Sequence, residues 1–281
     1  MKSKVFIFAA LLAIAGCSKV EDDSLSRVMI YAGFRDDPET RSRIELNEEG
    51  SVVKVLWTQG DSFTALYTGA DGVYKTTFTT YEDGVTDAAF WSNGSLAGTD
   101  FQCFYPDYNK WGNYEGETVF GINLHAEQTA VAGGIEEGLN RACAFAEKLS
   151  KDLREPVRFY NLPSLLKFRL EGAVVPEIKE VAFSSTGTLA GDMVFHWTGD
   201  ILTELPGDMS FSGDVHASRV VLKGDFQEGV DYYIALWPRK LSGFQMEFKD
   251  GNGDTVIKRS DKTVTFERSR VKDFGTIRLA D

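Results

Sequence analysis

The sequence predicts an all-β protein made of two tandem antiparallel β-sandwich domains. Beyond residue 27, apolar and polar residues alternate with a period of two, as in 166–171 (LKFRLE) and 244–249 (FQMEFK). Turn-forming Gly, Asn and Asp residues separate these stretches at short intervals, and only one stretch has helical spacing. Many short strands with frequent turns are typical of sandwiches, in which each strand buries one face and exposes the other.

Residues 1–16 have the features of a signal peptide. Lys2 and Lys4 form a positive start, and the unbroken apolar run 5–15 follows them. As a helix rising about 1.5 Å per residue, this run reaches roughly 17 Å, well short of the roughly 30 Å hydrocarbon core of a bilayer. We therefore expect a cleaved signal sequence here, and not a permanent membrane span.

The residues around Cys17 favour lipid attachment. The stretch 12–17 (LAIAGC) resembles a lipobox, with a branched residue, two small residues and then the cysteine whose thiol accepts the lipid. Two acyl chains, such as palmitate, hold a protein stably at a membrane, so Cys17 is the predicted membrane anchor. Residues 17–26 then form an acidic tether too poor in apolar residues to fold. The tether is either a plain spacer or an acidic signal like the surface-export signals of some Gram-negative lipoproteins.

The chain divides near Pro156. We expect the N-terminal sandwich over residues 27–154 and the C-terminal sandwich over residues 155–281, because Arg154-Glu155-Pro156 interrupts the pattern between them. Just before this division, residues 136–153 predict one short helix. The apolar residues at helical spacing in that stretch are Leu139, Ala142, Cys143, Ala146, Leu149 and Leu153.

Composition excludes some functions and leaves others open. The 30 basic residues fall to 28 without the signal peptide, while the 42 acidic residues remain, so the net charge moves from −12 to −14. Together with the absence of a Lys/Arg-rich stripe, this predicts no nucleic-acid partner. Cys103 and Cys143 form either one disulfide, which an oxidising envelope permits, or two separate buried thiols.

No stretch carries the pattern of an enzyme or of a metal or cofactor site. His125, His196 and His216 lie far apart and in no metal-ligand spacing, and nucleophile and phosphate-loop motifs are absent from the sequence. Residues 250–254 (DGNGD) begin like a calcium loop, but they lie between two strand-like runs, and a hairpin turn explains them better. We therefore expect neither an enzyme nor a cofactor.

One aromatic segment is a candidate ligand site. Trp111, flanked by Tyr108 and Tyr114, is the tryptophan best placed to stack on a sugar. The alternative is a loop that packs on its own domain.

The order of several motifs resembles the fimbrillin family over nearly the whole chain after the signal peptide. The WxxGD step at 57–61 and the block at 159–168 (FYNLPSLLKF) carry most of the weight. The chain departs from the family at His125, where proline often precedes the EQ pair. The other matching residues are 40–41 (TR), 104–106 (FYP), 124–128 (LHAEQ), 189–191 (LAG), 233–238 (YIALWP) and 243–244 (GF).

This resemblance implies two transthyretin-like domains and a structural or adhesive subunit of fimbriae at the cell surface. In the family, a protease cuts after an arginine that follows the first strand, and a strand from another subunit fills the groove that the lost strand leaves. Here 28–34 is the candidate first strand, 35–40 a cleavage loop, and Arg41 and Arg43 the candidate cut sites, unless these arginines only decorate a strand edge. The chain ends soon after 277–279, which leaves little room for a donor extension. A non-polymerising surface lipoprotein that binds glycans or host ligands is the alternative.

Overall fold

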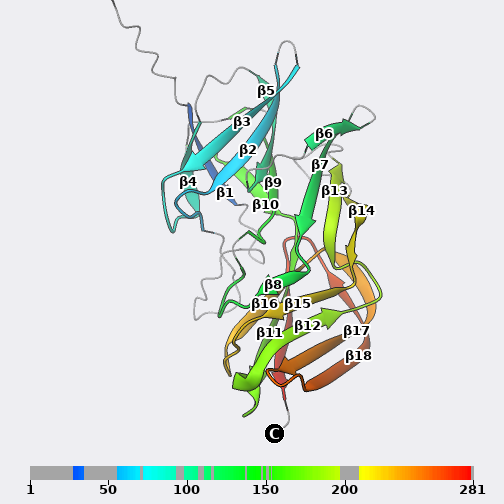
Figure 1. Ribbon diagram of the computed structural model, residues 1–281. Helices are drawn as coiled ribbons and strands as arrows, with labels where there is room; N and C mark the ends of the chain where they lie inside the picture. The colour runs from blue at the N-terminus through cyan, green and yellow to red at the C-terminus, as the bar shows by residue number, and fades with distance from the viewer. Residues whose placement is uncertain are drawn as a thin grey trace, which may run out of the picture.

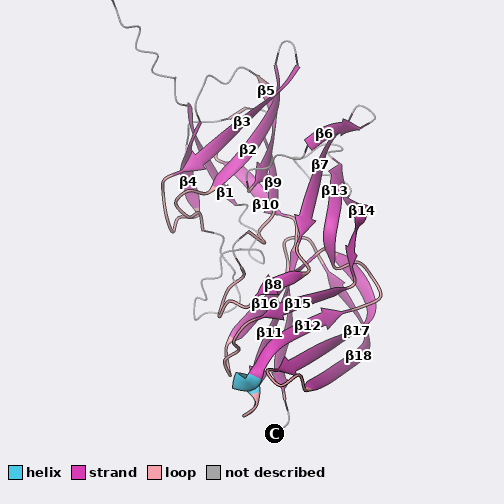
Figure 2. Ribbon diagram, in the orientation of Figure 1, coloured by secondary structure: helices cyan, strands magenta, loops and turns pink. Residues whose placement is uncertain are grey.

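A computed structural model confirms the all-β class. It describes residues 28–34, 56–69, 72–92, 98–106, 111–114, 117–136, 138–146, 148–149, 152, 154–196 and 209–279. Over these residues the chain forms nineteen strands and one 3-10 turn, η1 (Val175–Glu177). Figure 1 and Figure 2 show one group of strands above and a second, larger group below.

The upper group is a closed seven-stranded barrel. Its interior is apolar because alternate residues along each strand point inward, and rings such as Phe63, Phe78 and Phe90 are fully buried there. In hydrogen-bonded order, its strands are β1 (Val28–Phe34), β10 (Val157–Asn161), β9 (Ala142–Ala146), β5 (Thr99–Tyr105), β2 (Ser62–Gly69), β3 (Gly72–Thr80) and β4 (Asp87–Ser92).

Two sheets that share one apolar core form the lower group. The first is three-stranded, in the order β16 (Asp231–Leu236), β11 (Ser164–Glu171) and β19 (Val271–Arg278). The second is five-stranded, in the order β18 (Thr255–Phe266), β17 (Arg239–Asp250), β12 (Ile178–Ser184), β15 (Arg219–Lys223) and β8 (Glu127–Thr129).

A further four-stranded sheet has the order β14 (Met209–Ala217), β13 (Ala190–His196), β7 (Glu117–Leu124) and β6 (Trp111–Tyr114). Hydrogen-bonded pairing crosses the expected division between residues 154 and 155 in both directions. β10 lies after the division and completes the barrel, whereas β7 and β8 lie before it and pair with β13 and β15. The apolar core of the lower group also includes Leu66 and Phe104 from barrel strands.

The short helix expected within residues 136–153 is wrong, because the centre of that stretch is strand β9. This strand pairs with β5 on one side and β10 on the other. Ala142 and Ala144 face the barrel interior, and Cys143 faces the lower core. A strand that is buried on both faces shows no alternation, so its run of small apolar residues matches helical spacing by coincidence.

The buried side chain of Gln128 links two strands of the lower group. Gln128 in β8 is buried, and its side-chain amide both donates to the Ala235 carbonyl at 2.8 Å and accepts from the Ala235 N–H at 3.0 Å. The amide thereby replaces the ladder bonds that a neighbouring strand would provide, and links β8 to β16.

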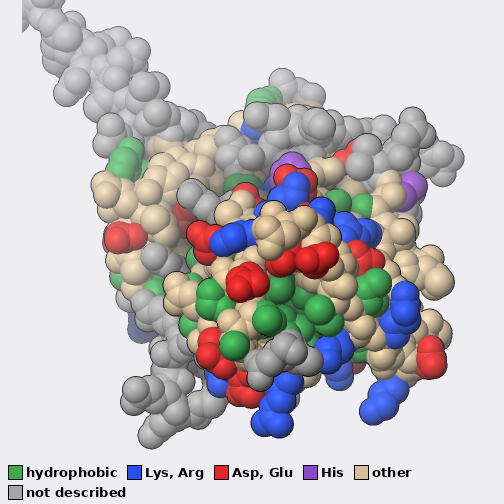
Figure 3. Space-filling model, turned by 60° about the horizontal axis from the view of Figure 1, so that its bottom comes forward, with side chains coloured by type: hydrophobic (Ala, Val, Ile, Leu, Met, Phe, Trp, Pro, Cys, Tyr) green, Lys and Arg blue, Asp and Glu red, His purple; other side chains and the backbone are tan. Residues whose placement is uncertain are grey.

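On the face shown in Figure 3, apolar side chains gather near the middle, with charged side chains of both signs around them.

Candidate functional site: the first strand of the barrel

Strand β1 occupies a place between two strands that are distant in sequence. It pairs antiparallel with β4 from Val28↔Ser92 to Gly33↔Asp87, and parallel with β10 from Ala32↔Val157 to Phe34↔Phe159. β1 provides the hydrogen-bond partners for one edge of β4 and for one edge of β10. Its removal would therefore expose backbone N–H and C=O groups on both strands.

Side chains of β1 fill the barrel interior. Ile30, Ala32 and Phe34 alternate along the strand and are buried. The Phe34 ring centroid lies 4.5 Å from that of Trp57 and 5.9 Å from that of Phe159. Loss of the strand would therefore also leave an apolar slot lined by aromatic rings.

The WTQGD step holds the barrel closed against β1. The Trp57 indole N–H donates to the carbonyl of Ala32 at 2.9 Å, which ties the turn directly to the first strand. The turn itself is closed by the Thr58 N–H, which donates to the Asp61 carboxylate at 2.7 Å, and by the positive φ of Gly60, 94°. The Tyr105 hydroxyl donates to the other Asp61 oxygen at 2.9 Å. The motif is thus a structural turn that fixes a core tryptophan.

An ion pair crosses over β1 at Gly33. The Arg158 guanidinium in β10 binds the Asp87 carboxylate in β4, and it also donates to the Phe34 carbonyl at 3.3 Å. A Cβ at Gly33 would collide with the Asp87 carboxylate and with the Arg158 guanidinium, so a larger residue there would have to displace the pair. Sequence reasoning missed this pair, since no local pattern links two residues 71 positions apart.

The two cysteines are separate buried thiols, which resolves the alternative that the sequence left open. Cys103 lies opposite Ala144, while Cys143 lies opposite Phe104 one position along the ladder. Directly opposite residues share a face and neighbours along a strand do not, so the two thiols point to opposite sides of the sheet. Burial raises the pKa of both thiols, that of Cys143 to about 12.

Of the other predicted site residues, two lie in a described strand and four lie outside the described residues. Trp111 and Tyr114 are the two ends of β6, which pairs with β7 and ends the four-stranded sheet. Tyr108, Cys17, Arg41 and Arg43 lie outside the described residues.

The loop at 250–254 is a hairpin turn, as expected. The Asp250 carboxylate accepts the N–H groups of Asn252 at 2.9 Å and Asp254 at 2.8 Å, and the turn joins β17 to β18. Among the described residues, no group of three His, Cys, Asp or Glu side chains is arranged to hold a metal ion. The described part of the chain also contains no helix with the length and apolar character to cross a bilayer.

Compared as a sequence, the chain matches no family model and no curated protein. Compared as a structure, it is similar to candidate cell adhesion proteins of three Bacteroides species. For the Bacteroides uniformis protein the TM-score is 0.55 at 14% identity, over 91% of this chain and 93% of that one. The Bacteroides ovatus protein gives 0.57 at 13% identity over 88% and 91%, and the Bacteroides fragilis protein 0.50 at 11% over 89% and 91%. At these identities the likeness establishes a shared all-β fold over nearly the full length of each chain.

Proposed function

We propose that the protein is a cell-surface lipoprotein that serves as a structural or adhesive subunit of fimbriae. Lipid on Cys17 holds it at the outer membrane, and its two halves are the transthyretin-like units that the motif order implies. The likeness of the whole chain to candidate cell adhesion proteins supports this assignment. In this role the protein carries out no reaction and needs no cofactor; its partners are other subunits and surface ligands.

The placement of β1 carries the proposal. The strand precedes the candidate cut sites Arg41 and Arg43, pairs on both sides, and contributes three buried side chains to the barrel. A cut at either arginine would separate β1 from the rest of the chain. A strand from another subunit would then restore both the hydrogen bonds and the alternating apolar side chains in the slot between β4 and β10.

Limited proteolysis of the folded, full-length protein tests this mechanism. We expect a trypsin-like protease to cut after Arg41 or Arg43 and the product to form oligomers, as measured by mass spectrometry and light scattering. A synthetic peptide of residues 28–34 should block oligomer formation by refilling the slot. The Arg41→Ala/Arg43→Ala variant is the control and should remain uncut there. A product that is cut but stays monomeric would rule out the polymerising role and favour the non-polymerising, ligand-binding surface lipoprotein.

Anchoring is tested separately. In a Gram-negative host fed a palmitate analogue, the wild-type chain should carry the label and fractionate with the outer membrane, whereas Cys17→Ser should lose both properties. Cys103→Ser is the matched control and should keep the label, because that thiol is buried in the barrel. Labelling of Cys17→Ser to the wild-type level would contradict the anchor assignment.

A further inference from the structure

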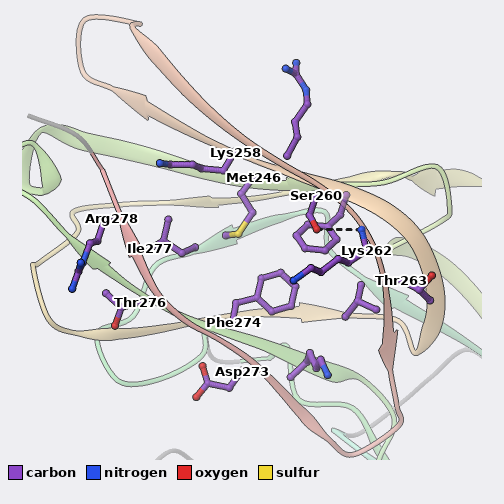
Figure 4. A pocket seen from close by; sticks show the side chains of 14 residues that line it. Met246, Lys258, Ser260, Lys262, Thr263, Asp273, Phe274, Thr276, Ile277 and Arg278 are labelled. Atoms are coloured by element: carbon purple, nitrogen blue, oxygen red, sulfur yellow. Dashed lines mark hydrogen bonds between the residues drawn. The ribbon is translucent and has the colours of Figure 1, made fainter.

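A groove of about 840 Å³ opens between β18 and β19 (Figure 4). β18 ends the order of the five-stranded sheet, and β19 ends the order of the three-stranded sheet. Within the described part of the chain, each of these strands pairs on one side only. Two strand edges without a pairing partner among the described strands therefore border the same hollow, which is the arrangement that accepts an added strand.

The floor of the groove is apolar. Met246 and Val264 are buried beneath it, and Phe274 and Ile277 are half-buried along one side. The Phe274 ring centroid lies 5.0 Å from that of Phe244, so the floor is continuous with the aromatic core of the sandwich. Figure 4 shows Met246 and Phe274 between the two strands that border the groove. An occupant must therefore present apolar side chains on one face.

The rim carries the opposite charge to the chain as a whole, whose net charge is −12. Asp273 is the single acidic side chain among the lining residues, and it already pairs with Lys167 at 3.4 Å. The basic lining residues are Lys258, Arg259, Lys262, Lys272 and Arg278. A local excess of positive charge on an acidic protein favours an acidic occupant.

Three of these cations are available to a partner. Arg278 pairs with Glu171 at 3.2 Å, and the Arg259 guanidinium donates to the side-chain oxygen of Gln245 at 3.3 Å. Lys258, Lys262 and Lys272 form no ion pair with any described residue. Lysines on an edge strand also discourage unwanted pairing, and that function alone would explain a charged edge. Protection of the edge against unwanted pairing does not explain the apolar hollow beneath the charges. A strand edge that needed only protection would have a filled or covered surface there.

We propose that this groove binds an extended peptide strand of a partner protein in which apolar side chains alternate with acidic ones. The backbone of the strand pairs with the free edges of β18 and β19, its apolar face covers Met246 and Phe274, and its carboxylates meet the lysines. β19 spans eight residues, so an occupant of about six to eight residues matches its length at roughly 3.3 Å per residue. This site is separate from the β1 slot and does not depend on the fimbrial role.

Binding of synthetic peptides to the full-length protein tests the proposal. We expect a fluorescent ten-residue peptide of alternating Val and Glu to bind, as measured by anisotropy, and its Val/Lys and Val/Thr counterparts to bind at least about tenfold more weakly. A polyglutamate peptide supplies the charge without the apolar face and should also bind weakly. Equal binding of polyglutamate would overturn the proposal, because the groove would then be only an anion-attracting surface.

Matched variants locate the site. Lys258→Glu/Lys262→Glu should weaken binding about tenfold, since each exposed ion pair contributes a factor of a few and reversal adds repulsion. Lys240→Glu/Lys249→Glu changes two exposed lysines of the neighbouring strand outside the groove and should alter affinity less than twofold. Equal losses in both variants would place the peptide elsewhere and refute the site.

A backbone-modified peptide tests strand pairing itself. In an extended strand, successive backbone N–H groups point to opposite sides. Two Val/Glu peptides are therefore made, one methylated on the odd-numbered backbone nitrogens and one on the even-numbered nitrogens. These are the two phases, and each lacks the N–H donors that would face one of the two strands, β18 or β19. At least one phase should abolish binding. Undiminished binding of both phases would show that the contact uses side chains only and would contradict the added strand.

Discussion

Replacement of Trp57 by phenylalanine tests whether the WTQGD turn stabilises the barrel core through this side chain. The Trp57 side chain is fully buried, and its indole N–H donates to Ala32 in β1. Its ring centroid lies 4.5 to 5.7 Å from four other aromatic rings, those of Phe34, Phe90, Tyr105 and Phe159. Phenylalanine keeps part of these contacts but removes the donor and leaves space where the larger ring was.

The expected loss of stability is about 2–4 kcal/mol. The buried hydrogen bond contributes about 1 kcal/mol, and an unpaired carbonyl would add to that loss. The missing ring atoms cost roughly a further 1–2 kcal/mol through lost burial and the cavity that remains. Trp91 in β4 is the matched control, because it is 36% exposed, and Trp91→Phe should change stability by less than about 0.5 kcal/mol.

Guanidinium unfolding followed by far-ultraviolet circular dichroism measures both variants without relying on tryptophan fluorescence. A loss below about 0.5 kcal/mol for Trp57→Phe, or equal losses for the two variants, would refute the assignment of the step to the core.

Two further predictions concern the buried polar and thiol groups. Gln128→Leu leaves the N–H and carbonyl of Ala235 without their side-chain partner and should cost about 2–4 kcal/mol in the same unfolding assay, whereas exposed Gln227→Leu should be nearly neutral. Cys103 and Cys143 should not react with a thiol reagent in the folded protein and should both react once it is unfolded; a disulfide-linked product would contradict the opposed faces. Burial raises the pKa of both thiols in the folded state, so above about pH 9 these thiols lose their protons only in the unfolded state. The free energy of unfolding should therefore fall with rising pH, by up to about 1.4 kcal/mol per pH unit for each thiol. The Cys103→Ala/Cys143→Ala variant should show a flatter fall.

The strands that alternate strictly were predictable from sequence. Residues 166–171 and 244–249 fall within β11 and β17, and each has one face in the core. In such stretches the burial of one face determines both the period and the conformation, so the local pattern is sufficient. β9 was not predictable in this way, because both of its faces are buried and its small apolar residues carry no period.

The sheet that each strand joins could not be derived from local pattern. β10 follows the expected domain division yet completes the barrel with β1, its parallel neighbour more than a hundred residues earlier. The ion pair between Asp87 and Arg158 above Gly33 has the same origin, since it exists only once β4, β1 and β10 lie side by side. Such features depend on long-range pairing, which single-sequence periodicity does not contain.

The described residues behind the family resemblance are largely internal. Trp57, Gln128 and Trp237 are buried, and their polar atoms bind backbone groups of other strands. Motifs of this kind maintain a fold and say little about what its surface binds. The chain can therefore share a fold with structures to which it is only 13–14% identical.

The two proposed strand-accepting sites differ in the chemistry that they would accept. The β1 slot holds an uncharged strand, residues 28–34, whose Ile30, Ala32 and Phe34 side chains lie inside the barrel. A strand of alternating apolar and acidic side chains could turn its apolar face into the barrel there, but a side chain at the position of Gly33 would collide with the Asp87–Arg158 pair. Conversely, the uncharged strand in the β18–β19 groove would leave Lys258, Lys262 and Lys272 without counter-charges and forgo their attraction. We therefore expect that the two sites do not exchange occupants and that a single protein binds two different strands at once.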